Sequence, residues 1–425
     1  MPEAADGGAP AGAPLGCGPL IQPVTSAQRP LRQQVFEHVR ALGEVPRVQL
    51  ARDLRVSPAS VTTITSELIE TGLLEEVTAR REGDGARGRP AVALRVRPGG
   101  QYVMGMKLSD RESTAVVVDL SGRVMASSAI SRTPGAMSVE VTLDAAETLM
   151  REVCDKGGLD PGELAAIGVG TPGFVDGGAG IVHWSPILDR RGVALAPLLS
   201  ERLGRPVLID NDTNLVTLAE LWFGAGRSLS DFAVVTIEHG VGMGFVINHR
   251  LYRGARSMGM ELGHTKVQLD GALCRCGQRG CLEAYLADYA LVREARTALN
   301  LPDPETRSVN VLLESLFEQA KAGNRAAQSI FRRAGRYLAL AMANVANLFD
   351  PQLIILSGER MRYDYLYAGE TLAEMKTMML ETGRAAPALE IHAWGDMIWA
   401  HGAAALALQD LTEQMLGSGQ EVAAQ

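Results

Sequence analysis

Four metal-ligand side chains, close together in the sequence, constrain the fold of this chain more than any other feature. They are His264, Cys274, Cys276 and Cys281, so three of the five cysteines fall within eight residues. This spacing is too tight for an ordinary disulfide framework, whereas three sulfurs and one imidazole nitrogen complete a tetrahedral zinc site. Because no coordination position is left for water, the pattern predicts one structural zinc ion per chain. Free thiols beside a core histidine are the alternative, and cysteines this dense seldom arise that way in an intracellular protein.

Two glutamates flank these ligands. Glu261 lies three residues before His264, and Glu283 lies two residues after Cys281. A metal ion that fixes the ligands therefore also fixes both carboxylates. Paired carboxylates beside a cleft accept hydrogen bonds from neighbouring hydroxyl groups, as in sites that hold sugars.

The N-terminal part of the chain has a pattern of short helices. Apolar residues recur at helical spacing over residues 31–42, and two further helices are expected at 47–54 and 58–71. Ser57 is suited to cap the third helix, because its hydroxyl accepts from the free N–H groups of the first turn. The sequence thus predicts a helix, a second helix, a turn and a third helix.

Two strands follow the helices, at residues 73–78 and 91–97, with a basic, glycine-rich tip between them. Together the elements predict a winged helix-turn-helix domain over residues 25–97. Residues 1–24 are almost free of large apolar side chains and are expected to form a disordered tail. A short linker is expected at residues 98–101.

In a winged helix-turn-helix domain the third helix enters the major groove of DNA. The side chains expected to meet bases or phosphates are Ser60, Thr62 and Thr63, with Arg52 and Arg55 beside the turn. At the wing, Arg87 and Arg89 of the Arg-Gly-Arg-Pro run could lie in a narrow A·T minor groove, whose negative potential attracts arginine. The alternative is a domain that only mediates protein contacts, with solvated arginines.

Charge is divided unevenly along the chain. Residues 29–97 carry twelve arginines against nine acidic residues, whereas the whole chain has a net charge of −8. This excludes a wholly basic nucleic-acid coat protein and leaves one small segment suited to an anion. No run approaches the roughly 18 apolar residues of a membrane span, and the N-terminus lacks a signal peptide pattern. A cytoplasmic protein without membrane insertion is therefore expected.

From residue 102 onward, apolar strands alternate with helices rich in alanine and leucine, which is typical of α/β architecture. Two glycine-rich strand turns, at residues 168–176 and 240–244, are expected to mark two lobes that face a cleft. The body is assigned to residues 102–425.

The cysteine-rich segment resembles the signature of a known family. Glu261-Leu-Gly-His264 followed by Cys274-Arg-Cys276-Gly-Gln-Arg-Gly-Cys281-Leu-Glu283 is similar to that of the ROK family, named for repressors, open reading frames and kinases. Residues 29–97 resemble the winged helix of its repressor branch, the xylose and N-acetylglucosamine repressor type. Residues 102–410 resemble its sugar-kinase body. The resemblance implies an actin-like ATPase fold, of ribonuclease H-like type, with a sugar held between two lobes.

The resemblance also implies roles for single residues. Glu261, His264 and Glu283 correspond to residues that contact sugar hydroxyls in the family. Asn211, in the run Ile209-Asp-Asn-Asp-Thr-Asn214, would bind the sugar as well. Asp212 matches the base that takes the proton from the attacking hydroxyl in the kinases. Here it is expected to bind the effector, with no catalytic role.

Two departures from the kinases concern the phosphate loops. The first loop of the kinases reads Asp-x-Gly-Gly-Thr, whereas this chain has Lys107, Ser109 and Asp110 at the matching positions. The second loop begins with Glu238-His239 in place of a glycine and a threonine. Added carboxylates oppose phosphate binding, so the nucleotide half of the site is expected to be disabled.

A third departure concerns the sugar. Ile187 follows Ser185-Pro186 where the kinases place a sugar-binding asparagine, so one hydroxyl contact is absent. The predicted protein is a DNA-binding regulator, a repressor of carbohydrate-utilisation genes, with a sugar or sugar phosphate as effector. A homodimer or homotetramer would grip operator DNA at an inverted repeat. The alternatives are a ROK-type sugar kinase that phosphorylates a hexose with ATP, and a docking surface for a protein partner such as a transporter.

Overall fold

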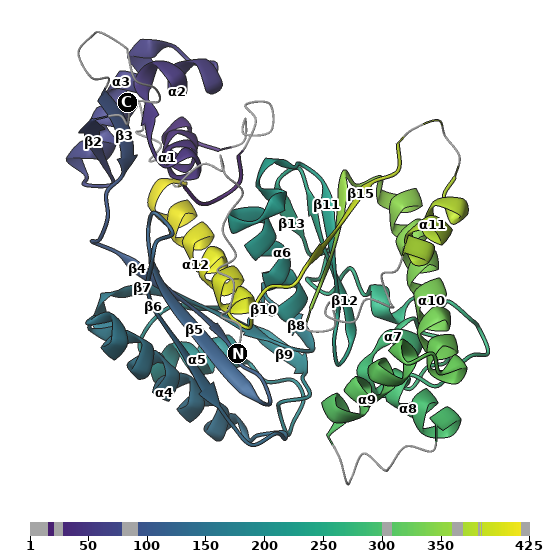
Figure 1. The fold of residues 1–425 in the computed structure, drawn as a ribbon. Coiled ribbons are helices and arrows are strands. Elements are labelled where there is room, and N and C mark those ends of the chain that lie inside the picture. The colour runs from purple at the N-terminus through teal and green to yellow at the C-terminus, as the bar shows by residue number, and fades with distance from the viewer. Residues whose placement is uncertain are drawn as a thin grey trace.

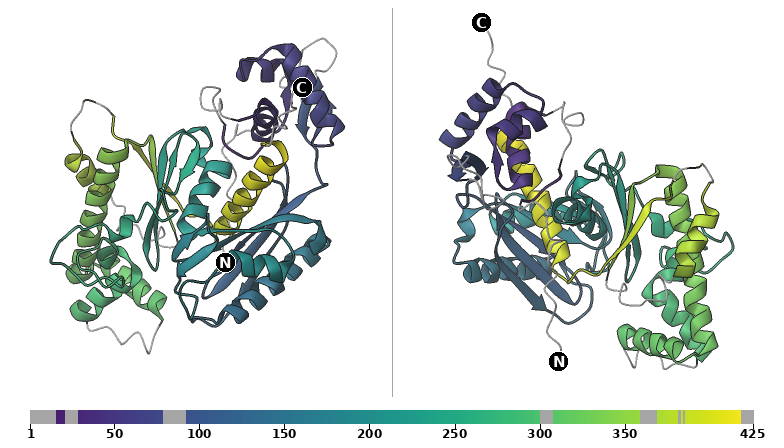
Figure 2. Two further views of the ribbon diagram at one scale, coloured as in Figure 1. Left: turned by 180° about the vertical axis from the view of Figure 1, so that it is seen from behind. Right: turned by 45° about the horizontal axis from the view of Figure 1, so that its top comes forward.

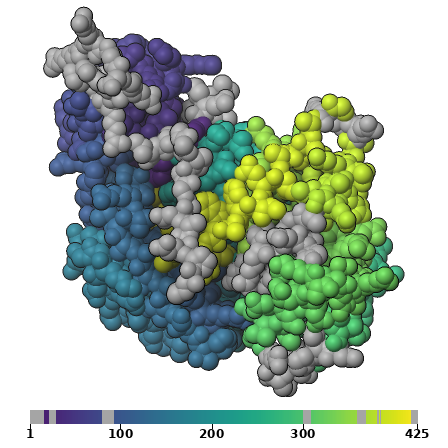
Figure 3. All heavy atoms as spheres, viewed as in Figure 1, coloured from purple at the N-terminus to yellow at the C-terminus, as the bar shows by residue number. Residues whose placement is uncertain are grey.

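The computed structural model describes residues 16–20, 29–78, 92–299, 308–358, 369–380, 383 and 385–417. Figure 1 shows a small N-terminal domain, a first lobe beneath it and a second lobe beside the first. In the space-filling view of Figure 3, the N-terminal domain stands out at one end of the molecule above the first lobe.

The N-terminal domain contains the three predicted helices. These are α1 (Leu31–Leu42), α2 (Arg47–Asp53) and α3 (Pro58–Glu70). The Ser57 hydroxyl accepts a hydrogen bond from the backbone N–H of Ser60 at 3.1 Å, which confirms the predicted cap of α3. Val61 and Leu68 of α3 are buried in the domain core. The helices form because each apolar stripe is covered by the others.

A three-stranded antiparallel sheet completes this domain, in the order β1-β3-β2. Its strands are β1 (Val45–Pro46), β2 (Leu74–Thr78) and β3 (Val92–Val96). β2 and β3 confirm the two predicted strands. β1 was not expected, because a pair of residues carries no alternation that sequence analysis could detect. The predicted wing tip, with Arg87 and Arg89, lies outside the described residues.

The first lobe is a five-stranded sheet in the order β10-β7-β4-β5-β6. Its strands are β4 (Tyr102–Lys107), β5 (Glu112–Asp119), β6 (Val124–Ser131), β7 (Leu164–Thr171) and β10 (Val207–Asn211). Two helices, α4 (Val139–Gly157) and α5 (Leu195–Leu203), cover one face. The hairpin of β8 (Phe174–Asp176) and β9 (Ile181–Trp184), and the short helix η1 (Pro161–Glu163), complete the lobe.

The second lobe repeats this topology. Its sheet has the order β13-β12-β11-β14-β15, in which three antiparallel strands are followed by two parallel ones. The first sheet has the same arrangement when it is followed from β6 to β10. The strands are β11 (Phe232–Ile237), β12 (Val241–Ile247), β13 (Arg250–Tyr252), β14 (Leu353–Ser357) and β15 (Ala388–His392). The helices are α7 (Glu283–Leu286), α8 (Asp288–Leu299), α9 (Val309–Lys321), α10 (Arg325–Phe349) and α11 (Gly369–Met378). The predicted two-lobed α/β body is confirmed.

Two helices, α6 (Asp212–Phe223) and α12 (Ile398–Leu416), lie between the sheets and pack against each other. α12 approaches the first sheet closely because two strand positions lack a side chain. A Cβ atom on Gly105 would lie 2.0 Å from the carbonyl oxygen of Ala400, and one on Gly168 would lie 2.0 Å from that of Ala403. Any larger residue would push α12 off the sheet.

The N-terminal domain is docked on the body as well as linked to it. α1 lies at the C-terminal end of α12, as both views of Figure 2 show. Arg32 Nε donates to the Leu416 carbonyl at 3.0 Å, and Arg40 Nη1 donates to Thr412 Oγ1 at 2.8 Å. Arg227, in the short helix η2 (Ala225–Ser228), donates to the Ala41 carbonyl at 2.5 Å.

The expectation of a disordered tail over residues 1–24 is wrong for residues 16–20. These five residues pack between the N-terminal domain and the body, and Cys17 is 4% exposed. Cys17 N donates to the Arg40 carbonyl, and Gly18 N donates to the Trp222 carbonyl, at 3.1 and 2.8 Å. Composition could not predict this, because the ordering comes from backbone hydrogen bonds and not from large apolar side chains.

None of the helices in the described ranges is both long and apolar enough to cross a membrane.

Candidate functional site

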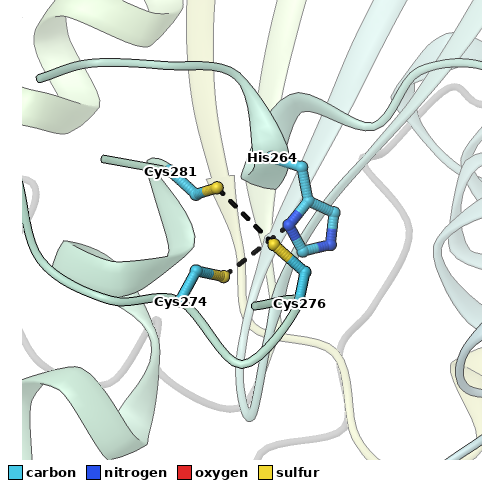
Figure 4. A group of neighbouring side chains, drawn as sticks. All are labelled: His264, Cys274, Cys276 and Cys281. Atoms are coloured by element: carbon cyan, nitrogen blue, oxygen red, sulfur yellow. Dashed lines mark hydrogen bonds between the residues drawn. The ribbon is translucent and has the colours of Figure 1, made fainter. Parts of the chain in front are cut away.

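The four predicted metal ligands converge on one point. Their ligand atoms all lie within 4.8 Å of one another, and Figure 4 shows the side chains directed toward a common centre. Cys276 Sγ lies 3.7 Å from Cys281 Sγ, and Cys274 Sγ lies 3.8 Å from His264 Nδ1. Tetrahedral zinc with Zn–S bonds of about 2.3 Å places its sulfurs about 3.8 Å apart. The donor set and its spacing therefore fit a closed zinc site.

Short backbone turns hold these ligands. His264 ends the short helix η3 (Leu262–His264), and Cys281 pairs with Lys266 in an isolated β-bridge. Cys274 and Gln278 close a tight turn in which Gly277 has a φ of 87°, a conformation that favours glycine. Lys266 Nζ lies 2.9 Å from Cys281 Sγ. Three thiolates carry more negative charge than one zinc ion can neutralise, so a lysine beside them would offset the excess.

The metal cluster is joined directly to the predicted carboxylates. Glu283 begins α7 and is buried, and its Oε1 lies 3.5 Å from Cys274 Sγ. The Tyr289 hydroxyl donates to the same oxygen at 3.3 Å. Glu261 lies just before η3 and is more open to solvent than Glu283. Desolvation, with repulsion from Glu283 and Asp212, raises the pKa of Glu261 to about 7. The three carboxylates thus share one small region.

Asn211 lies where β10 meets α6. Its Oδ1 accepts from the backbone N–H of Thr213 at 2.8 Å and so caps α6, while its Nδ2 donates to the Gly173 carbonyl at 2.7 Å. The buried Asp210 supports this corner, because its carboxylate accepts from Asn211 N at 2.8 Å and pairs with Arg253 at 2.7 Å. Sequence analysis assigned no role to Asp210 or Arg253.

Asp212 is the first residue of α6. Burial raises the pKa of its carboxyl, and the nearby Lys107 and His239 side chains oppose that rise. A cation from the first altered loop and an imidazole from the second therefore both act on Asp212. Both altered loops therefore lie near Asp212.

Side chains of both altered loops contact other residues of the protein. Lys107 Nζ lies 3.3 Å from the ring centroid of Trp399 on α12, a cation–π contact. Ser109 Oγ donates to the Glu112 carbonyl at 2.7 Å, which closes the β4–β5 turn on itself. His239 Nδ1 lies 2.8 Å from the buried Asp288 carboxylate, and this hydrogen bond raises the pKa of His239.

An aromatic pair beside His264 was missed by sequence analysis. The Phe174 ring lies 5.9 Å from the His264 ring and 5.7 Å from the Trp184 ring, centroid to centroid. Trp184 is 37% exposed. The signal that could have found them is their position on β8, which ends the glycine-rich stretch at residues 168–176, and on β9, which follows it. Ile187, by contrast, is buried in the core of the first lobe and offers no polar group.

Five of the predicted DNA-contacting residues lie on α2, on α3 or at the turn between them, and Arg87 and Arg89 lie outside the described residues. Arg52, Arg55, Thr62 and Thr63 are exposed, and Ser60 is half-buried. Arg55 has a φ of 55° at the turn between α2 and α3, so the turn itself is tight. The Thr62 and Thr63 hydroxyls donate to the carbonyls of Pro58 and Ala59, which leaves their oxygens able to accept.

Comparisons with known proteins agree with this arrangement. The N-acetylglucosamine repressor of Escherichia coli O6:H1 is 30% identical over 76% of this chain and 79% of its own length. A crystal structure of a ROK family transcriptional regulator, a homologue of the E. coli Mlc protein, superposes with a TM-score of 0.75 at 27% identity. The superposition covers 93% of this chain and 98% of the Mlc homologue. A ROK hexokinase from Thermus thermophilus superposes with a TM-score of 0.64 at 29% identity over 74% of this chain and all of that one. Residues 103–410 match the ROK family, and the chain belongs to that family.

Proposed function

We propose that this protein is a DNA-binding transcriptional repressor of carbohydrate-utilisation genes, controlled by a sugar or sugar derivative bound between its two lobes. The proposal rests on one observation, which is that this chain combines two features. A helical N-terminal domain with exposed arginines and threonines is docked on a kinase-like body whose phosphate loops are altered. The N-acetylglucosamine repressor and the Mlc homologue, with which the chain shares sequence and fold, support the same role.

The effector would lie where the β10–α6 junction, the η3 turn and the start of α7 meet. We assign its hydroxyl contacts to Asn211, Asp212, Glu261, His264 and Glu283. The Tyr289 hydroxyl fixes the Glu283 carboxylate, and the Gly173 carbonyl fixes the Asn211 amide, so both groups are held ready for hydroxyl groups. Because the pKa of Glu261 is raised to about 7, its carboxyl can donate as well as accept a hydrogen bond near neutral pH. Phe174 and Trp184 would add an apolar wall against the sugar ring.

The zinc ion would be held by His264, Cys274, Cys276 and Cys281. When bound it supplies a rigid anchor and no reactive water, because protein ligands fill all four positions. This chain's own residues then do the binding: the anchored turn positions Glu261 on one side and Glu283 on the other.

A kinase role is less well supported. Kinase phosphate loops present backbone N–H groups and a metal-binding carboxylate to ATP, whereas here a lysine seated on Trp399 takes the carboxylate's position. Asp110 and Glu238 would also face the phosphates. We therefore assign no catalytic residue, and treat Asp212 as an effector ligand.

Coupling between the two functions would run along α6 and α12. α6 begins at Asp212 in the effector site and ends at the joint with the N-terminal domain. α12 carries Trp399 near the cleft and Thr412 against Arg40. Closure of the lobes around an effector would shift these helices, and with them the N-terminal domain. The energy available is only the difference in effector affinity between the two states.

The winged helix-turn-helix, assigned to residues 25–97, would bind an operator as part of a homodimer or homotetramer. Two-fold symmetry in the protein would match an inverted repeat in DNA. Selection of bound sequences from a random DNA library tests this directly. Enrichment of an inverted repeat supports the proposal, and enrichment of nothing contradicts it.

The effector is tested by thermal shift with N-acetylglucosamine, xylose, glucose, their phosphates, and ATP with magnesium. A ligand that binds only the folded state raises the melting temperature. We expect a shift with one sugar or sugar phosphate that is lost in Glu261→Gln and kept in Glu318→Gln, a matched change on the exposed surface of α9. A shift with ATP and magnesium, followed by phosphate transfer, would establish the kinase instead.

A further inference from the structure

An ion pair joins the two lobes beside the candidate effector site. Asp210 is the fourth residue of β10 in the first lobe, and Arg253 directly follows β13 in the second lobe. Arg253 Nε and Nη2 each lie 2.7 Å from Asp210 Oδ2. The side chain of Asp210 is 2% exposed and that of Arg253 is 26% exposed. Charge-assisted hydrogen bonds of this kind are stronger than those between neutral groups, and burial protects them from screening.

The other oxygen of the Asp210 carboxylate supports the effector site. Asp210 Oδ1 accepts from the backbone N–H of Asn211 at 2.8 Å and from Asn214 Nδ2 at 2.7 Å. The Asn211 side chain in turn caps α6 and donates to the Gly173 carbonyl. One carboxylate therefore fixes the backbone of Asn211 in the first lobe and binds Arg253 of the second lobe at the same time.

Arg253 begins the loop that leads to Glu261. The backbone N–H of Gly259 donates to the Arg253 carbonyl at 2.9 Å, so residues 253–259 form a loop that is closed on itself. A Cβ atom on Gly254 would lie 3.3 Å from the Cα atom of Gly259, because the two ends of the loop approach closely. One residue separates this loop from Glu261. A side chain that anchors the start of the loop therefore also restricts the position of Glu261.

The β8–β9 turn of the first lobe packs against both partners of the ion pair. A Cβ atom on Gly177 would lie 2.8 Å from the Ile209 carbonyl oxygen and 3.9 Å from the carboxyl carbon of Asp210. A Cβ atom on the next residue, Gly178, would lie 3.6 Å from Ser257 Oγ in the loop of the second lobe. The three segments that carry Asn211, Glu261 and the aromatic pair thus meet at this ion pair.

We propose that Arg253 is a positioning residue for the effector site, whose ion pair with Asp210 holds Glu261 of the second lobe in place relative to Asn211 of the first lobe. This role rests on the proposed function, in which Glu261 and Asn211 contact the effector. Arg253 itself needs no contact with the effector. Closure of the lobes would leave the pair intact, so both ligands would keep their relative position. Without the pair, Glu261 and Asn211 would have to be ordered at the moment of binding.

Hydrogen–deuterium exchange of the full-length chain without ligand tests the connection between the lobes. Arg253→Met should speed exchange about tenfold, the factor that corresponds to about 1.4 kcal/mol of lost stabilisation. The increase should occur in residues 254–265, beside the substitution, and also in residues 207–214 of the other lobe. Arg250→Met, which removes an exposed arginine of β13, should change neither segment. Unchanged exchange in residues 207–214 of Arg253→Met overturns the proposal, because Arg253 would then stabilise its own loop alone.

A second variant covers the case in which Arg253→Met does not fold because Asp210 is left buried without its cation. The double variant Asp210→Asn with Arg253→Met removes both charges. Its asparagine oxygen can still accept from the Asn211 N–H and from Asn214 Nδ2, so the contact that is lost is the one between the lobes. The same faster exchange is expected in both segments, and normal exchange in either segment overturns the proposal.

Calorimetric titration tests the effect on binding, with N-acetylglucosamine first and then the other sugars of the thermal-shift panel. For a sugar that binds the wild type, Arg253→Met should raise the Kd about tenfold, whereas Arg253→Lys should recover part of the loss and Arg250→Met should change nothing. An unchanged Kd in Arg253→Met overturns the proposal. If no sugar binds the wild type, the proposed effector is wrong, and the exchange experiment still decides whether Arg253 positions the two residues.

Discussion

Removal of one zinc ligand should weaken effector binding without touching any atom that contacts the effector. Cys276→Ala is the sharpest version, because Cys276 is exposed and its truncation leaves no hole in the core. Without the metal, the turn that carries Cys274 and Cys281 loses its anchor. Glu261 and Glu283 must then be ordered at the moment of binding instead of in advance.

The magnitude follows from that ordering. Immobilising a side chain on binding costs about 0.5–1.5 kcal/mol, so two freed carboxylates cost about 1–3 kcal/mol. Each 1.4 kcal/mol is a factor of ten in affinity, so the Kd should rise about 5- to 140-fold. Part of the Glu283 geometry should survive, because Tyr289 still donates to it. This favours the lower half of the range.

The assay is calorimetric titration of the variant with the effector identified by thermal shift, with zinc content measured on the same sample. Gln278→Ala is the matched control, since Gln278 is exposed in the same turn and its side chain is no ligand. Loss of zinc with an unchanged Kd would refute the reasoning, because it would show that the carboxylates are held without the metal.

Three further predictions rest on other parts of the chain. Asn211→Ala removes the cap of α6 at Thr213, so the free energy of unfolding measured in urea should fall by about 1 kcal/mol even without effector. The bond to Glu220 raises the pKa of His392, so its stabilisation is complete below about pH 6.5 and is lost as pH rises through the raised value. The difference in unfolding free energy between the wild type and His392→Gln should therefore shrink from pH 6 to pH 8, and a constant difference would contradict this. Arg89→Ala should weaken DNA binding most at sites with A·T-rich flanks, whereas equal loss at G·C-rich flanks would indicate a phosphate contact.

The parts of the structure that follow from local chemistry were predictable from the sequence. α1 has the predicted bounds because an apolar stripe and a terminal glycine define it locally. The metal cluster was predictable because its ligand spacing is short, so few chain paths bring the atoms together. Ser57 was recognised as a cap because its hydroxyl acts within one turn of its own residue.

Contacts between distant segments could not be predicted in this way. The packing of residues 16–20 depends on carbonyls of Arg40, Trp222 and Arg227, which are far away in the sequence. The contact of Lys107 with Trp399 joins β4 to a helix almost 300 residues later. Neither Phe174 nor Trp184 carries a motif, and only the fold brings their rings beside His264.

The residues that differ from the kinase phosphate loops are explained together if the body senses an effector, as proposed, and does not phosphorylate it. A kinase must admit ATP, transfer a phosphoryl group and release the product, so its phosphate loops need open backbone and a metal-binding carboxylate. A sensor needs a cleft whose closure moves something else. Here Lys107, at the end of β4, contacts Trp399 of α12, and α12 ends against Arg32 and Arg40 of the N-terminal domain. Under the proposed function, the lysine that stands where the kinases have a carboxylate therefore also connects the effector site to the helix on which the N-terminal domain is docked.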